Sequence, residues 1–128
     1  MINVWIPYQA GFERFRTECK ELYLSSKSKI KDDSSFEFVL NNTFFYLFEK
    51  DGILIGGIYY FKGIDSKLYL NGFAKRKMHE LCLNCLKMSL NWFRGRVYAE
   101  AQNRASALCL LRCGFKREKG KLFVKNLP

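Results

Sequence analysis

The stretch from Val97 to Phe115 reads VYAEAQNRASALCLLRCGF, and its pattern is the most informative in the chain. A strand is expected from Arg96 to Ala101. Asn103 is predicted to cap a helix through Cys113, because an asparagine oxygen accepts hydrogen bonds from the unpaired amides of a first helical turn. Gly114 is predicted to end that helix, since glycine readily takes the left-handed conformation common after a last turn. The next residue then begins another strand.

The middle of the chain predicts three consecutive strands. Thr43 to Lys50 and Ile53 to Lys62 are dense in aromatic and β-branched residues, and only Asp51-Gly52 separates them, which is the two-residue signature of a tight hairpin. Gly56-Gly57 inside the second segment indicates a bulge or a close backbone approach. Lys67 to Phe73 supplies the third strand.

The N-terminal third predicts a strand followed by helices. Ile2 to Ile6 alternates weakly and is rich in β-formers. After it, apolar residues recur at helical intervals of three and four: Phe12, Phe15, Cys19, Leu22 and Tyr23. The serine-rich polar stretch from Leu24 to Ser35 is interpreted as a loop, leading into a short helix at Phe36 to Leu40.

The remaining elements complete the order. One apolar face predicts a long helix from about Lys77 to Phe93, ended by Gly95. A final hairpin is expected from Phe115 to Lys119 and from Lys121 to Val124. The predicted order is therefore β-α-α-β-β-β-α-β-α-β-β.

Composition narrows the class of protein. A chain of 128 residues with 48% hydrophobic content suits a single domain, residues 1–128. No leader pattern is found, and the longest apolar run, Ile53 to Phe61, is far shorter than a membrane span. Five cysteines, an odd number lying mostly within helical patterns, favour a reducing, cytoplasmic location. The net charge of +10 predicts attraction to polyanions, either phosphorylated cofactors or nucleic acids.

The element order, Asn103 and the Gly114-Phe115 pair resemble the GNAT superfamily of acyl-CoA-dependent N-acyltransferases. The resemblance covers about Thr43 to Val124. It implies an α/β (α+β) fold with a mixed, largely antiparallel sheet of six to seven strands flanked by helices. It also implies acetyl-CoA as acyl donor and direct attack by an amine in a ternary complex.

The resemblance implies a cofactor site. In the family, the strand before the long helix separates from its neighbour, and acyl-CoA lies in the gap with its pyrophosphate on the helix N-terminus, which is a natural anion site. The residues that this places around acyl-CoA are Asn71, Phe73, Lys75, Arg76, Lys77, Met78, Asn103 and Ala107.

The sequence departs from the family at this helix start. The usual glycine pattern is missing, because no glycine lies between Phe73 and Trp92. Lys75-Arg76-Lys77 stands there instead. Cations at a helix N-terminus oppose the helix dipole unless an anion binds among them. Our hypothesis is that these side chains replace part of the missing glycine contacts; a solvated basic turn is the alternative.

Candidate catalytic residues lie on the strand that precedes Asn103. Glu100 is the best placed general base, with an exposed or Arg96-paired carboxylate as the alternative. Tyr98 shares its strand face and is a candidate donor, with core packing as the alternative. The tyrosine that the family uses as an acid corresponds to Leu110, so water is expected to protonate the thiolate.

Cysteines and the one histidine are interpreted as structural. Cys109 and Cys113 lie in an apolar helical pattern typical of core thiols. His79 lies near Cys82 and Cys85, but a zinc site needs four converging ligands and no second pair is present. No metal is expected.

Three functions stay open at this stage. The first is acyl transfer to an amine of a small molecule, or to a protein N-terminus or lysine. The second is an inactive CoA-binding or structural module with the same fold. The third is a basic nucleic-acid-binding domain, although no recognised DNA or RNA motif is present. No membrane partner is expected, and the chain is expected to be a monomer or a homodimer.

Overall fold

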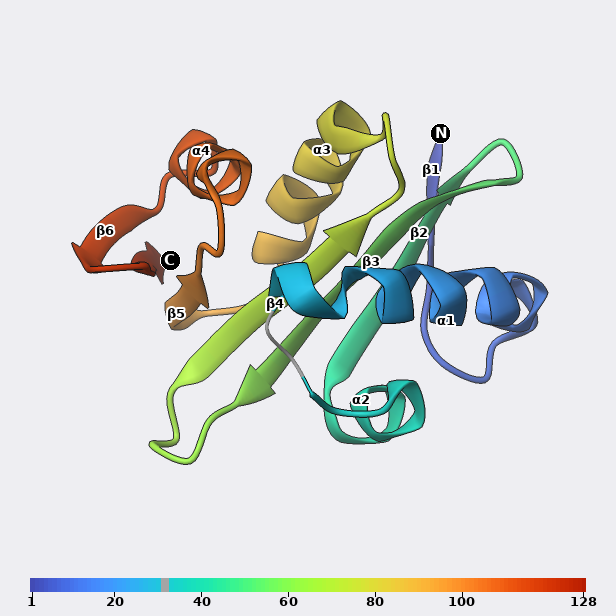
Figure 1. The fold of residues 1–128 in the computed structure, drawn as a ribbon, viewed down its shortest axis with the longest axis horizontal. Coiled ribbons are helices and arrows are strands. Elements are labelled where there is room, and N and C mark those ends of the chain that lie inside the picture. The colour runs from blue at the N-terminus through green and yellow to red at the C-terminus, as the bar shows by residue number, and fades with distance from the viewer. Residues whose placement is uncertain (31–32) are drawn as a thin grey trace.

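The computed structural model describes residues 1–30 and 33–128. Figure 1 shows a twisted sheet with α1 crossing in front of β3 and β4. The elements are, in order, β1 (Ile2–Trp5), α1 (Ala10–Ile30), α2 (Phe36–Asn42), β2 (Phe44–Lys50), β3 (Ile53–Lys62), β4 (Leu68–Ala74), α3 (His79–Leu90), β5 (Gly95–Glu100), α4 (Arg104–Arg112), β6 (Lys116–Lys119) and β7 (Leu122–Leu127). This confirms the predicted element order.

The sheet has seven strands in the order β1-β2-β3-β4-β5-β7-β6. Every neighbouring pair is antiparallel except β4 and β5, which are parallel. The mixed, largely antiparallel sheet is therefore confirmed. The parallel pair is joined by α3, as a parallel connection requires a crossover.

The two faces of the sheet bury separate cores. Strand residues alternate between the faces, so Leu70 and Val97 join the core beneath α3 and α4, while Tyr59 and Phe73 join the core beneath α1 and α2. The second core ends at β4, which leaves the same face of β5 without a covering helix in Figure 1.

The central hairpin forms as expected. Asp51 and Gly52 both have positive φ, at 53° and 78°, which matches the twist of the strands that they join. The register shifts by one residue after Phe48, which confirms the predicted bulge beside Gly56. The backbone of Phe73 passes directly over that glycine.

The serine-rich stretch is mostly helical, so its interpretation as a loop is wrong up to residue 30. Helix α1 continues to Ile30, and within it the Ser25 hydroxyl donates to the Leu22 carbonyl at 2.9 Å. Burial of Tyr23 and Ser26 outweighs the weak helix propensity of serine. Residues 31–32, part of the predicted loop, lie outside the described residues. Ser35 caps α2, whose predicted helix is confirmed.

Helix α3 is shorter than expected at both ends, spanning His79–Leu90. Lys77 has a φ of 69°, a left-handed conformation that a helix cannot contain. Helix α4 keeps the predicted Asn103 cap, whose side chain accepts from the Ser106 amide at 2.8 Å. No helix within the described ranges has the length and apolar character needed to cross a bilayer.

Candidate active site

Strands β4 and β5 separate soon after they meet. They pair at only two positions, Leu68 with Val97 and Tyr69 with Tyr98. Strand β4 then runs on to Ala74, whereas β5 pairs with β7 along its whole length. A gap therefore opens between the carboxyl-terminal halves of two parallel strands.

The register of β3 and β4 decides which backbone groups face this gap. The Gly63 amide donates to the Lys67 carbonyl, and the Lys75 amide donates to Ile55. Alternation along β4 then points the N–H and C=O groups of Asn71 and Phe73 toward β3, and those of Leu70 and Gly72 toward β5; the Leu70 N–H belongs to the last paired position with Tyr98, so the first backbone amide beyond the pairing is that of Gly72. Asn71 and Phe73 can therefore contact a molecule in the gap only through their side chains. The Asn71 side chain already accepts from the Gly72 amide at 3.0 Å.

Helix α3 begins at the open end of the gap. Met78 occupies the N-cap position and provides no side-chain hydrogen bond to the first turn. First-turn amides without a capping side chain carry partial positive charge and can bind an anion.

The three cations of the basic turn before α3, residues 75–77, differ in their contacts. The Lys75 ammonium lies 2.7 Å from the Glu18 carboxylate on α1, so it is drawn across the sheet, away from α3. Arg76 and Lys77 are exposed and form no ion pair within residues 1–30 and 33–128. Two of the three predicted cations therefore remain available to an anion.

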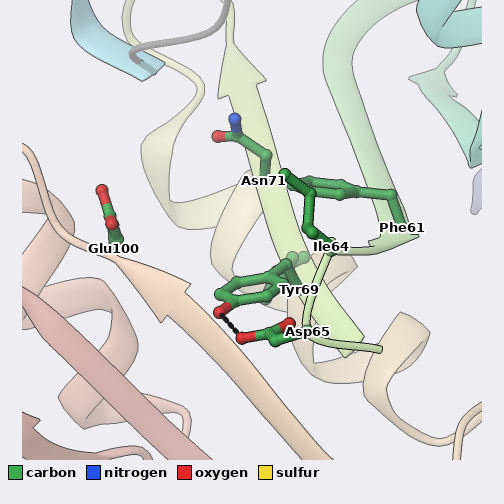
Figure 2. A pocket seen from close by; sticks show the side chains of 8 residues that line it. Phe61, Ile64, Asp65, Tyr69, Asn71 and Glu100 are labelled. Carbon is green, nitrogen blue, oxygen red and sulfur yellow. Dashed lines mark hydrogen bonds between the residues drawn. The ribbon is translucent and has the colours of Figure 1, made fainter. Parts of the chain in front are cut away.

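A cavity of about 530 Å³ lies where β4 and β5 begin to diverge. Its lining comes from the end of β3, the β3–β4 turn, β4 and the end of β5: Phe61, Gly63, Ile64, Asp65, Tyr69, Leu70, Asn71 and Glu100. Figure 2 shows the Tyr69 hydroxyl directed at the Asp65 carboxylate, with Glu100 on the β5 side. The cavity is within the usual size range of small-molecule sites.

Asp65 and Tyr69 are electrostatically linked. The Tyr69 hydroxyl donates to the Asp65 carboxylate at 2.8 Å, and this bond, with burial, raises the pKa of Tyr69. The Lys67 amide donates to the same carboxylate at 3.0 Å. That backbone bond, followed by the tyrosine bond, lowers the pKa of Asp65, so the carboxylate is charged at neutral pH.

Glu100 is exposed at the end of β5, and its carboxylate accepts a hydrogen bond from the side-chain amide of Gln102 at 3.2 Å. Arg96 is not its partner, because Arg96 Nε donates to Asn126 at 3.1 Å. The Arg96 guanidinium also hydrogen-bonds the Tyr98 hydroxyl, which raises the pKa of Arg96. Glu100 thus keeps an accessible carboxylate in the cavity wall.

Tyr98 is buried, with 4% of its surface exposed, and does not line the cavity. Its ring lies 5.7 Å from the Tyr69 ring and beneath the Lys67 ammonium, 4.9 Å from the ring centre. Tyr98 therefore lies beside Tyr69 on the same sheet face and packs against it.

Comparison with solved structures identifies the fold. An acetyltransferase of the GNAT family from Staphylococcus aureus Mu50 matches with a TM-score of 0.66 and 15% identity, covering 100% of both chains. The chain has the GNAT fold. An N-acetyltransferase from the same organism matches at 0.74 and 13% identity, over 99% of this chain and 98% of its own. An acetyltransferase from Bacillus subtilis in complex with CoA matches at 0.61 and 12% identity, over 100% of both. No protein-family model and no curated protein matches the sequence.

Within this GNAT fold, α4 offers fewer groups for binding and catalysis than the resemblance to the family implied. Asn103 uses its side-chain oxygen to cap the helix. Ala107 is half-buried and packs against the core beneath α3 and α4. Leu110 is buried in that same core, so the position at which the family has a tyrosine carries no proton donor in this chain.

Four of the five thiols, those of Cys82, Cys85, Cys109 and Cys113, lie in this same core, whereas Cys19 lies in the core beneath α1 and α2. Burial raises the pKa of Cys82 and of Cys85 to about 12, so both stay protonated. Cys113 hydrogen-bonds Cys109, and this bond lowers the pKa of Cys109 while raising that of Cys113. No cluster of three or more metal-ligating side chains occurs in the described part of the chain.

Sequence reasoning missed the GNAT cavity residues Phe61, Asp65 and Tyr69. Asp65 lies in a turn, where an aspartate ordinarily accepts hydrogen bonds from its own backbone. The sequence did contain one signal, because Tyr69 and Asn71 lie two positions apart on one strand and their side chains therefore share a face. Only the register of the strands shows which face of β5 lies beside that face.

Proposed function

We propose that this chain is an acyl-CoA-dependent N-acyltransferase that transfers an acetyl group from acetyl-CoA to an amine. The observation that carries the proposal is the separation of β4 from β5 after Tyr69 and Tyr98, with the uncapped start of α3 at its open end. We also propose that residues 1–128 act as one domain. The five free cysteines support a cytoplasmic location.

The residues around the gap fit acetyl-CoA. Arg76, Lys77 and the first-turn amides of α3 present positive charge to a pyrophosphate. Backbone groups of Leu70 and Gly72 face the space that a pantetheine arm would fill. We assign Phe73, Met78, Asn103 and Ala107 to the walls of this space, with Asn71 at its inner end. Acetyl-CoA supplies an activated thioester.

Glu100 is the proposed general base. Its carboxylate lines the cavity at the point where the strands part, so an amine held there can give its proton to Glu100 directly or through one water. The Gly72 amide, which lies beyond the last paired position of β4 and β5, is the proposed hydrogen-bond donor to the acetyl oxygen, and in this role it exchanges its bond to the Asn71 side chain for one to that oxygen. Tyr98 supports this geometry by packing beside Tyr69. Water is the proposed proton source for the departing thiolate, because Leu110 has no proton to give.

Two measurements test this function. Acetyl-CoA is expected to raise the melting temperature, and free thiol is expected to appear only when an amine is added. Glu100→Gln is expected to lower turnover about 100-fold and to abolish its rise with pH, without changing the acetyl-CoA shift. Unchanged turnover and pH profile in this variant would remove the base assignment.

A double variant, Arg76→Ala with Lys77→Ala, tests the proposal that these two side chains bind the pyrophosphate. The expected result is weaker acetyl-CoA binding in calorimetry, with a weaker dependence on salt concentration. A variant at Lys119 and Lys121 is the matched control, because these two lysines are equally exposed and lie on the distant β6–β7 hairpin. Equal affinities in both double variants would contradict the assignment.

A CoA-binding module without transferase activity is the second candidate. The burial of Leu110 favours it, because that position carries the usual acid of the family. The melting-temperature shift would then persist while no amine released thiol. The two candidates differ in that single measurement.

A further inference from the structure

The charge of the cavity is opposite to that of the chain. The chain carries a net charge of +10, yet the eight lining residues include two carboxylates, Asp65 and Glu100, and no lysine or arginine. Asp65 is held in its charged form by the hydrogen bonds from Lys67 N–H and the Tyr69 hydroxyl. A carboxylated molecule entering this space would meet repulsion from both sides.

Two cations beside the cavity, Lys67 and Arg96, are engaged elsewhere. Lys67 rests on the Tyr98 ring, and Arg96 bonds Asn126 and Tyr98. Neither lines the cavity. Lys67 offsets part of the Asp65 charge. The two negative charges of the carboxylates still exceed the one positive charge of this lysine.

The remaining wall is aromatic and aliphatic. The rings of Phe61 and Tyr69 are stacked, 5.8 Å apart with 19° between their planes. Ile64, at the tip of the β3–β4 turn, is fully exposed at the edge of this wall. Stacked rings offer both apolar contact for methylene groups and attraction for an ammonium group.

We propose that the acceptor is an alkyl diamine or polyamine: one that carries a second ammonium group and no carboxylate. The proposal rests on the proposed function and names the substrate class of its site. One amine lies at Glu100, where the proton is removed, and the second ammonium lies at Asp65, on the other side of the cavity in Figure 2. The methylene chain between them packs on Phe61 and Tyr69. Asp65 is thus a specificity-determining residue.

Three four-carbon amines separate the contributions: 1,4-diaminobutane, butylamine and 4-aminobutanoate. They share one amine on a chain of three methylenes and differ in the group at the far end of that chain, which is an aminomethyl, a methyl or a carboxylate group. Binding is measured by calorimetry at low salt with CoA present, and transfer by thiol release. Diaminobutane is expected to bind about fivefold more tightly than butylamine, as a part-exposed ion pair allows, and aminobutanoate the most weakly. Equal affinities, or tighter binding of aminobutanoate, would overturn the proposal.

Asp65→Asn tests the residue itself. Asparagine keeps an oxygen for the Lys67 amide and removes the charge, so the affinity ratio of diaminobutane to butylamine is expected to fall to about one. The change should appear in KM and not in kcat, because Asp65 takes no part in the proposed proton transfer to Glu100. Asp51→Asn, in the β2–β3 turn, is the matched control and should keep the ratio. A ratio that survives Asp65→Asn would overturn the assignment.

The two proposals fail differently. If acetyl-CoA neither binds nor is consumed, the transferase proposal fails, and the binding order of the three amines without CoA still decides the acceptor class. If thiol is released equally with all three amines, the transferase proposal stands and the acceptor inference is wrong.

Discussion

Gly56 of β3 lies against the backbone of Phe73 in β4, so closely that a Cβ at this position would overlap the Phe73 carbonyl oxygen. This contact sets the spacing of β3 and β4 in the part of β4 that no longer pairs with β5. It is a direct link between the glycine pair of the central hairpin and the geometry of the gap.

Gly56→Ala is therefore expected to destabilise the fold by about 2–4 kcal/mol, because neither backbone can move without breaking the ladder on one side. Urea unfolding measures the loss. Gly72→Ala is the control, since its Cβ would stay 3.3 Å from the nearest atom, the Gly57 oxygen. Equal losses in the two variants would show that the close contact carries no special cost.

Lys77 is the one residue of the basic turn with a left-handed backbone, at a φ of 69°. A side chain costs about 1 kcal/mol in this conformation, whereas glycine tolerates it. Lys77→Gly is therefore expected to be about 1 kcal/mol more stable than Lys77→Ala, although both remove the same charge. Thermal unfolding of the pair measures this difference. An alanine variant as stable as the glycine variant would exclude backbone strain at this turn.

Glu49 is a buried carboxylate outside the candidate site. Burial raises its pKa, but hydrogen bonds from Asn3 at 2.7 Å, Gly52 N–H at 3.0 Å and Trp5 at 3.4 Å outweigh this effect, so the pKa lies below its ordinary value. A lowered pKa stabilises the fold above the unfolded-state value of about 4.3, and that stability is lost as pH falls through the folded-state value.

The corresponding variant is Glu49→Gln. It is expected to cost about 1–3 kcal/mol at pH 7 and to flatten the decline of stability between pH 5 and pH 3. Urea unfolding across this range measures both effects. Glu118→Gln, at an exposed position on β6, is the control and should keep the wild-type slope. A Glu49 variant with that same slope would contradict the assigned pKa shift.

Cys109 is expected to be the most reactive thiol of its helix pair. Its bond to Cys113 lowers its pKa, whereas burial holds the pKa of Cys82 near 12. Alkylation at pH 7.5, followed by mass spectrometry, should therefore modify Cys109 several-fold faster than Cys82, because the thiolate is the nucleophile. Cys113→Ala should slow the reaction at Cys109. A faster reaction in that variant would mean that Cys113 only shields its neighbour.

Local sequence patterns predicted most of the elements. The Asp51-Gly52 turn, the Asn103 cap and the stop at Gly114 each depend on the conformational preference of one or two residues, and each forms as expected. The serine-rich segment did not follow its local preference, because burial of Ser26 favours helix in a way that composition does not reveal.

What the sequence by itself determined is the order of elements, and with it the mixed, largely antiparallel sheet that the GNAT resemblance implied, because turns, caps and periodicity are properties of neighbouring residues. Tertiary structure alone decided where β4 leaves β5, that Lys75 pairs with Glu18, and that Asp65 shares a cavity with Glu100. These relationships join residues at least 29 positions apart in the sequence. The register of the strands between them, and not their own local preferences, brings such residues together.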